Sequence, residues 1–350
     1  MTLRDAVRTA SNSVSKASRE LATLSADDTV PRPERVDAFR KLTARDVGDT
    51  WLRRSRGIER DFDREGVYLK FEGDNPTGTQ KDRIAFAHAE DALRRGASTV
   101  SFATCGNYGV AVALAARLAG VRCMIYVPAG YHTKRLAEME ALGATIYRPV
   151  GTYEEIVAYS TTESIRHGWY DANPGTTNSA LQLRAYSAIA DELIAQLPAV
   201  PVTVAVPVSN GTLLAGIFQG FQRLHAAGRI ERLPRMVASS STHKNPIVTS
   251  FLWGSPKCLD LDPAKITETD VNEPLINWHS FDGQEALDAL YASGGGARHV
   301  SDAKLRKMST YLREKEALQV LPASTAGLIA LLELGADEQG PQVAVLTAKR

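Results

Sequence analysis

The stretch VYLKFEGDNPTGTQKDR, residues 67–83, joins an apolar run to a turn and to the start of an amphipathic segment. The run 67–71 predicts a β-strand, and Asn75, Pro76 and Gly78 are typical turn formers. Lys81 then stands at the mouth of a helix expected from Asp82 to about Arg95. The positive end of a helix dipole disfavours the charged ammonium and so favours an amine that acts as a nucleophile. From spacing alone, a solvated lysine is the simpler interpretation.

Short apolar runs and amphipathic segments alternate from this stretch to the end of the chain. This rhythm indicates consecutive βαβ units and parallel sheets. Strands are expected at 98–104, 121–128, 144–150, 202–208, 235–241 and 343–348. Helices are expected at 110–120, 133–143, 152–168, 181–197, 213–224, 300–317 and 324–335. The glycines Gly294, Gly295 and Gly296 are interpreted as a flexible connection before a helix.

Composition sets broad limits on the function of the 350-residue chain. Lys plus Arg number 41 and Asp plus Glu number 40, a balance that gives no argument for nucleic acid or an acidic membrane surface as partner. The cysteines Cys105, Cys123 and Cys258 lie far apart and form no metal-ligand or disulfide pattern, so no metal site is expected. With no secretory signal and no long apolar run, the sequence predicts a soluble, cytoplasmic protein.

Two further strand-to-helix loops carry groups that could bind a ligand, because ligands of open α/β sheets bind at the carboxyl ends of strands. The loop 104–109, TCGNYG, offers backbone N–H groups beside a helix start and the amide of Asn107, which suits a carboxylate. The loop 207–216, PVSNGTLLAG, offers N–H donors, small side chains and a hydroxyl, which suits a phosphate. Singly, each is also consistent with an ordinary βα turn. At the end of the last expected strand stands Thr347, whose simpler interpretation is a strand threonine.

Taken in order, these four features resemble the fold type II pyridoxal-phosphate enzymes, and most closely the threonine synthase branch of that family. The family's NPTGSFKDR motif is similar to residues 75–83, and its SSGNTG loop to residues 104–109. Its phosphate loop VGNGGN resembles residues 208–213, and its closing VLTG resembles residues 345–348. The SGG…VSD and EPAS segments resemble residues 293–302 and 321–324. The resemblance runs from about residue 65 to the C-terminus, and the lysine motif is its most specific part.

The resemblance implies a role for each of these positions. Lys81 is expected to be the catalytic residue, joined to pyridoxal 5'-phosphate as a Schiff base, and Asn107 is expected to bond the cofactor's 3-oxygen. Thr347 is expected to face the pyridine nitrogen with a hydroxyl, which makes the ring a weaker electron sink than a carboxylate would and suits elimination or replacement. The phosphate is expected on Ser209, Asn210, Gly211, Thr212 and Leu213. The substrate is expected on Thr104, Cys105, Gly106, Tyr108 and Gln182.

The resemblance also implies an α/β fold of two three-layer αβα domains with parallel sheets and the cofactor in the cleft between them. The predicted organisation has a helical lead-in, residues 1–60, that packs on the large domain. The large cofactor-binding domain is expected at 61–85 and 186–350, and a small mobile domain at 86–185. A homodimer is expected from the family.

One departure from the family's pattern bears on the substrate. The arginine of the family's NSxNPYRLEGQKT stretch falls on Gln182, with Arg184 two residues away. A buried phosphate dianion without a guanidinium loses strong charge-assisted hydrogen bonds. The sequence therefore favours a β- or γ-substituted amino acid other than O-phosphohomoserine.

The predicted function is a lyase or synthase that acts on a β- or γ-substituted L-amino acid by elimination or replacement. Threonine synthesis, β-replacement of the cysteine synthase kind and serine or threonine deamination all stay open. A protein of another class, a non-catalytic binder of the cofactor or of an amino acid, is the alternative, and the intact Lys81 and Asn107 argue against it. A nicotinamide enzyme lacks a glycine fingerprint here.

Overall fold

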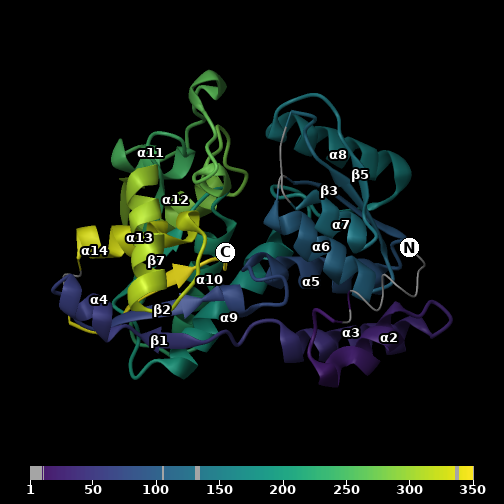
Figure 1. The fold of residues 1–350 in the computed structure, drawn as a ribbon, viewed down its shortest axis with the longest axis horizontal. Coiled ribbons are helices and arrows are strands. Elements are labelled where there is room, and N and C mark those ends of the chain that lie inside the picture. The colour runs from purple at the N-terminus through teal and green to yellow at the C-terminus, as the bar shows by residue number, and fades with distance from the viewer. Residues whose placement is uncertain (1–9, 11, 105, 131–134, 336–338, 350) are drawn as a thin grey trace. The chain divides into compact units, whose positions relative to one another are not determined.

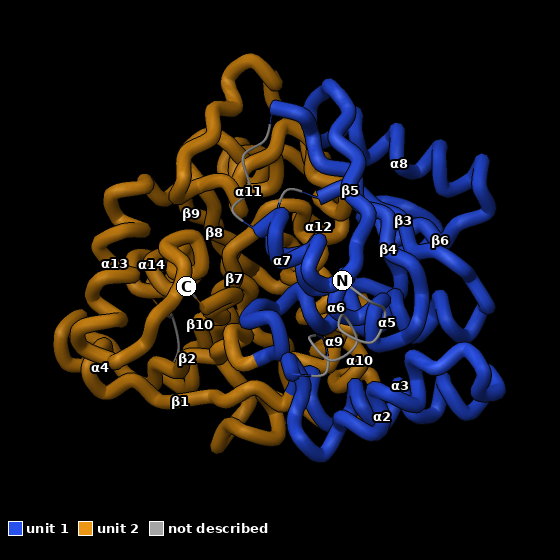
Figure 2. The backbone as a smooth tube through the Cα atoms, turned by 45° about the vertical axis from the view of Figure 1, so that its right-hand side comes forward, with its two compact units in different colours: residues 1–48, 75–182 blue, residues 49–74, 183–350 orange. Residues whose placement is uncertain are grey.

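A computed structural model describes residues 10, 12–104, 106–130, 135–335 and 339–349. The chain divides into two compact units, drawn in blue and orange in Figure 2. Unit 1 comprises residues 1–48 and 75–182, and unit 2 comprises residues 49–74 and 183–350. This division differs from the predicted ranges, because the N-terminal helices belong with residues 75–182 and not with the larger unit.

In unit 1 the sheet has the strand order β5-β4-β3-β6, and all its pairings are parallel. Its strands are β3 (Thr99–Ala103), β4 (Arg122–Tyr126), β5 (Thr145–Tyr147) and β6 (Tyr170–Asp171). Its helices are η1 (Lys16–Ser18), α2 (Arg19–Ala26), α3 (Arg32–Asp46), α5 (Lys81–Arg95), α6 (Asn107–Leu118), α7 (Leu136–Ala141) and α8 (Tyr153–His167). Helix α9 (Ser179–Gln196) begins here and continues into unit 2.

Specific contacts attach the N-terminal helices to the rest of unit 1. The ring of Phe39 on α3 stacks on that of Phe86 on α5, with 5.6 Å between centroids. The hydroxyl of Ser25 donates to the carbonyl of Leu118 at the end of α6, at 2.7 Å. Arg35 donates to the carbonyl of Ala119 at 2.8 Å. Helices α2 and α3 therefore cover faces of α5 and α6 that would otherwise meet water.

In unit 2 the sheet has the order β1-β2-β10-β7-β8-β9, parallel except for the edge strand β1. Its strands are β1 (Leu52–Arg54), β2 (Val67–Phe71), β7 (Thr203–Pro207), β8 (Arg235–Ser241), β9 (Gly296–Val300) and β10 (Gln342–Leu346). Its helices are α4 (Arg56–Asp61), η2 (Glu72–Asp74), α10 (Thr212–Ala226), α11 (Pro246–Leu252), η3 (Pro263–Lys265), η4 (Glu273–Leu275), α12 (Gly283–Ala292), α13 (Asp302–Lys315), η5 (Pro322–Thr325) and α14 (Ala326–Leu334). Figure 1 shows the course of these elements from purple to yellow.

Both faces of this sheet are covered, as its apolar strands require. Alternate strand residues such as Leu69, Ala205 and Ala344 join one core cluster with side chains of α13 and α14. The residues between them, such as Val204 and Val343, are equally buried on the other face, and α10 packs against β7 and β8. Unit 2 is thus a three-layer αβα structure, which confirms the α/β fold with parallel sheets.

The triplet Gly294–Gly296 leads into a strand and not into a helix. Gly294 takes a positive φ of 58° and ends the turn after α12, and Gly296 is the first residue of β9. A Cβ on Gly295 would collide with the carbonyl oxygens of Met236 and Leu290. The glycines are present because two backbones approach closely, so the interpretation as a flexible connection before a helix was wrong.

Candidate functional site

Lys81 is the first residue of α5 and is half-buried. The loop before it is held by Asp82, whose carboxylate accepts hydrogen bonds from the backbone N–H and the hydroxyl of Thr77, each at 2.9 Å. Asn75 closes the other end, since its carbonyl accepts from the N–H of Gly78 at 2.8 Å. The motif therefore folds as a tight loop that presents Lys81 at a helix N-terminus.

Complete burial raises the pKa of the Asp82 carboxyl from 3.8 to about 7, although the bonds from Thr77 and the charge of Arg135 act in the opposite direction. The side chain of Lys81 reaches the next helix, and its Nζ lies 5.7 Å from the centroid of the Tyr108 ring. The Tyr108 hydroxyl is fixed by a bond of 2.7 Å to the carbonyl of Ala172. Unit 1 thus brings together the predicted lysine and one predicted substrate residue.

The loop 104–108 lies at the carboxyl end of β3 and begins α6 at Asn107. The N–H of Gly106 donates to the hydroxyl of Thr104 at 3.3 Å, and nothing lies within 4 Å of where a Cβ on Gly106 would stand. Cys105 lies outside the described residues. This arrangement is compatible with the expected carboxylate-binding loop.

A residue that the sequence analysis did not single out contacts this loop. Arg135, the residue before α7, donates from Nη1 to the side-chain oxygen of Asn107 at 2.8 Å. Its other guanidinium nitrogens bond Glu138 at 2.7 and 3.1 Å. Because the Asn107 oxygen is engaged, the Asn107 nitrogen is the end of the amide left to donate to a ligand. An arginine in an irregular loop carries no sequence signal that would have identified this contact.

Gln182 is buried, with 1% of its surface exposed, and its side-chain nitrogen donates to the carbonyl of Asn173 at 3.2 Å. Its amide therefore contributes to the interior of unit 1. Arg184, two residues on, is exposed and belongs to unit 2.

The predicted phosphate turn, residues 209–213, lies at the carboxyl end of β7 and begins α10. Among the described residues, no protein acceptor takes a hydrogen bond from the backbone N–H groups of these five positions. Gly211 has a φ of 94°, and a Cβ there would lie 2.6 Å from the carbonyl oxygen of Asp282. Such a set of N–H donors at a helix N-terminus fits a phosphate. The Thr212 hydroxyl, however, donates to the Asp282 carboxylate at 2.5 Å.

Thr347 follows β10, which lies between β2 and β7 in the sheet. The carboxyl ends of these parallel strands meet at one edge, so Thr347 and the phosphate turn leave the same edge of unit 2. The Thr347 hydroxyl lies 2.9 Å from that of Ser324, and either hydroxyl can be the donor. The described residues hold no group of three or more His, Cys, Asp or Glu side chains that could bind a metal ion.

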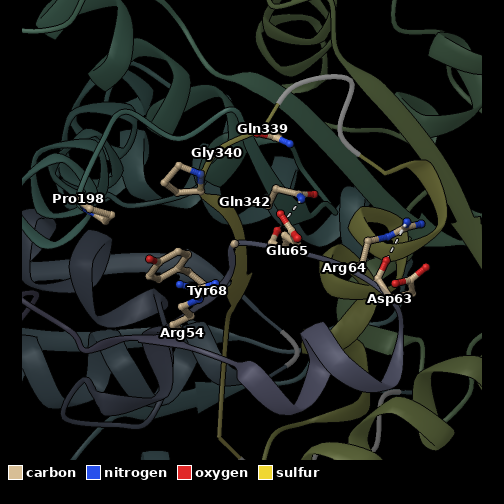
Figure 3. A pocket seen from close by; sticks show the side chains of 11 residues that line it. Arg54, Asp63, Arg64, Glu65, Tyr68, Pro198, Gln339, Gly340 and Gln342 are labelled. Carbon is tan, nitrogen blue, oxygen red and sulfur yellow. Dashed lines mark hydrogen bonds between the residues drawn. The ribbon is translucent and has the colours of Figure 1, made fainter.

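A pocket of about 560 Å³ lies elsewhere on unit 2 (Figure 3). Its lining includes Arg54, Arg64, Tyr68 and Gln342, and the last two stand at or near the amino ends of β2 and β10. This is the opposite end of the strands from Thr347. The pocket is therefore separate from the residues that the sequence selected.

No helix in the described part of the chain has the length and apolar character needed to cross a membrane.

A family model described as "Pyridoxal-phosphate dependent enzyme" matches residues 43–348. The chain is 30% identical over 315 residues to a threonine synthase of Methanocaldococcus jannaschii, across 88% of this chain and 75% of that protein. It is 29% identical over 286 residues to one of Methanosarcina acetivorans, across 80% and 69% of the two chains. The solved structure of maize serine racemase matches with a TM-score of 0.71 and 18% identity, across 90% of this chain and 93% of that one. At that identity the last match supports the fold alone.

Proposed function

Because the chain belongs to the family of pyridoxal-phosphate-dependent enzymes, we propose that Lys81 is the residue that holds the cofactor's aldehyde carbon and moves the substrate's proton. The chain is a threonine synthase-like lyase or synthase that acts on an amino acid by elimination or replacement at the β or γ carbon. The observation that carries the assignment of Lys81 is its place in an NPTG–KDR loop at the start of α5, beside Tyr108.

When bound, pyridoxal phosphate supplies an electron sink that stabilises negative charge at the substrate's Cα. Lys81 Nζ takes the proton from Cα as a general base and returns it later as a general acid. Asn107 would donate from its side-chain nitrogen to the cofactor's 3-oxygen, an orientation that the bond from Arg135 supports. Thr104, Gly106 and Tyr108, with Cys105, hold the substrate's α-carboxylate.

The phosphate end of the cofactor is assigned to residues 209–213, because their backbone N–H groups donate to no protein acceptor in the described part of the chain and lie at the positive end of α10. Thr347 would hold the pyridine nitrogen through a neutral hydroxyl. Because a hydroxyl does not keep that nitrogen protonated, the residues favour elimination and replacement over transamination.

The substrate is proposed to be a β- or γ-substituted L-amino acid other than O-phosphohomoserine, because Gln182 stands where the family has the arginine expected to bind the phosphate leaving group. The support is that the amide of Gln182 is buried, neutral and bonded to Asn173, so that no guanidinium stands at this position. Replacement of the cysteine synthase kind and serine or threonine deamination are the competing reactions. A homodimer and a cytoplasmic location stay predictions.

Borohydride reduction of the holoenzyme followed by peptide mapping tests the assignment of Lys81. The pyridoxyl label is expected on Lys81, and Lys81→Ala is expected to abolish both labelling and turnover. A label on another lysine would refute the assignment. A correctly labelled protein that turns over no amino acid would favour the non-catalytic binder.

A substrate panel then identifies the reaction. Phosphate, ammonia and keto acid are measured with O-phosphohomoserine, O-acetylserine, serine and threonine as substrates. Efficient phosphate release from O-phosphohomoserine would contradict the proposal drawn from Gln182.

A further inference from the structure

Two carbonyl groups of the phosphate turn accept hydrogen bonds from residues elsewhere in unit 2. The carbonyl of Ser209 accepts hydrogen bonds from Asn245 Nδ2 at 3.0 Å and from Ser280 Oγ at 3.1 Å. The carbonyl of Asn210 accepts from the backbone N–H of Asp282 at 3.0 Å. The carbonyls of Ser209 and Asn210 are thus engaged, while the backbone N–H groups of residues 209–213 have no protein partner among the described residues.

Side chains of the turn are held by the same segment. Asn277 Nδ2 donates to the side-chain oxygen of Asn210 at 3.1 Å, and Asp282 accepts from the hydroxyl of Thr212 at 2.5 Å. The carbonyl of Asp282 also lies where a side chain at Gly211 would stand. The backbone conformation of the turn, including its positive φ, is thus matched to residues 277–282.

Four buried side chains hold the turn, and we name them the turn scaffold: Asn245, Asn277, Ser280 and Asp282, with 0%, 4%, 7% and 2% of their surfaces exposed. The first three are linked to one another, and Asp282 is linked to them through the turn. Asn245 Nδ2 donates to Asn277 Oδ1 at 2.9 Å, and Asn277 Nδ2 donates to Ser280 Oγ at 3.0 Å. The oxygen of Asn245 also caps α11 by accepting from the N–H of Ile247 at 3.1 Å. Buried networks with satisfied members fix a single geometry.

We infer that the turn scaffold positions the N–H groups of residues 209–213 for the cofactor's phosphate and thereby sets the affinity for the phosphorylated cofactor. This inference rests on the proposed function. Thr212 then serves the phosphate through its backbone N–H, because its hydroxyl is committed to Asp282. None of the four scaffold residues belongs to the motifs that assigned the site, and each acts through the turn.

The test compares the dissociation constants of pyridoxal phosphate and of pyridoxal, which lacks the phosphate, for the apo forms of wild type and Asn277→Ala. Loss of the bond to Asn210 is expected to weaken pyridoxal phosphate about tenfold, since one hydrogen bond contributes up to about that factor. The affinity for pyridoxal is expected to stay within twofold, because only the phosphate end is disturbed. Equal losses for both ligands, or none for either, would overturn the inference.

Asn272→Ala is the matched control. Asn272 is also a buried asparagine of the connection between α11 and α12, but its side chain accepts from the N–H of Thr269 and not from a group of the turn. It is expected to lower the melting temperature of the apoprotein without changing the ratio of the two affinities. If Asn272→Ala changes that ratio as much as Asn277→Ala does, the effect is structural and the inference is wrong.

Two milder variants keep the test decisive if Asn277→Ala does not fold. Ser280→Ala removes one bond to the Ser209 carbonyl, and Asp282→Asn keeps an acceptor for Thr212. The first is expected to change the affinity ratio severalfold and the second to change it less; an unchanged ratio in Ser280→Ala counts against the inference. Failure of the proposed function would appear separately, as a wild-type protein that binds no pyridoxal phosphate or carries it on a lysine other than Lys81.

Discussion

The hydroxyl oxygens of Ser324 and Thr347 lie 2.9 Å apart, and the same Ser324 oxygen accepts a hydrogen bond from the backbone N–H of Ala348 at 2.9 Å. Ser324 lies within η5, a single short 3-10 helix just before α14. Its position therefore fixes both the rotamer of Thr347 and the end of β10. The pair ties the last strand of the chain to the segment that precedes α14.

Removal of the Thr347 hydroxyl is expected to affect the bound cofactor more than removal of its partner. Thr347→Val deletes the group proposed to face the pyridine nitrogen, so cofactor affinity should fall about tenfold and the visible absorption should change. Ser324→Ala leaves that hydroxyl in place and should have a smaller effect. The two variants are compared by cofactor titration and absorption spectra. Identical spectra for Thr347→Val and wild type would exclude this role.

Replacement of Arg135 by methionine is expected to weaken cofactor binding severalfold, because the oxygen of Asn107 loses its donor and the amide can rotate. Arg122→Met is the control, since Arg122 bonds Ser98 at the amino end of β4. The measurement is again the dissociation constant, together with the absorption of the bound form. Equal behaviour of the two arginine variants would contradict the assigned contact.

Asp82 predicts a pH dependence of stability with a definite sign. Its pKa is raised by burial from 3.8 to about 7 in the folded protein. The folded state therefore holds the proton more tightly, and the stability this gives is present below pH 3.8 and is lost as the pH rises through about 7. Asp82→Asn should flatten this part of the curve of melting temperature against pH.

The opposite sign at a second carboxylate provides the control for this measurement. The pKa of Asp91 is lowered, despite burial, by hydrogen bonds from Arg94 and Tyr170. Asp91→Asn should therefore remove stability that the wild type has at neutral pH and loses in acid. A curve for Asp82→Asn parallel to that of wild type between pH 4 and 7 would refute the prediction for Asp82.

Gly211→Ala is expected to destabilise the apoprotein by at least about 1–2 kcal/mol and to abolish tight cofactor binding. The added carbon meets the carbonyl of Asp282 at 2.6 Å in a backbone conformation with φ of 94°. Gly228→Ala is the matched control just after α10, because Gly228 also has a positive φ, 66°, but no atom within 4 Å of the added carbon. Thermal unfolding and cofactor titration are measured for both variants. A loss seen in both reports the strain of a positive φ, and a loss seen only in Gly211→Ala reports the collision with Asp282.

Lys70→Met should cost about 3–5 kcal/mol of unfolding free energy, because it leaves a mostly buried carboxylate without its cation. Lys70 Nζ is inaccessible and bonds Glu192 at 2.6 Å and the carbonyl of Thr50 at 2.5 Å. In contrast, Lys41→Met breaks an exposed pair with Asp37 and should cost under about 1 kcal/mol. Urea unfolding measures the free energy of unfolding of both variants. Similar losses in the two would show that the burial of Lys70 does not matter.

The main elements of the fold were readable from the sequence because hydrophobic periodicity governs them. The expected strand 235–241 coincides with β8, and the expected helix 152–168 differs from α8 by one residue at each end. The short strand β6, residues 170–171, carries no such pattern, and β9 was missed because its first residue belongs to a glycine triplet. Elements whose form depends on a close neighbour, and not on their own pattern, could not be predicted.

The site divides in the same way. Lys81, Asn107, residues 209–213 and Thr347 were identifiable because they stand in motifs with a fixed order. Arg135 and the turn scaffold were not, since polar residues of irregular loops acquire their partners only through the fold. The partner of the Thr212 hydroxyl was not predictable for a related reason, since its acceptor, Asp282, lies 70 residues away in the sequence.

The place of β10 in its sheet has a consequence for synthesis of the protein. Residues 342–346 insert between β2, at 67–71, and β7, at 203–207, and pair with both. A nascent chain that has left the ribosome up to residue 330 still lacks the strand that joins β2 to β7, so β2 has only β1 and β7 has only β8 as a native neighbour until residues 342–346 have emerged. We expect chaperone dependence to centre on this interval, whereas the whole sheet of unit 1 has been made by residue 171.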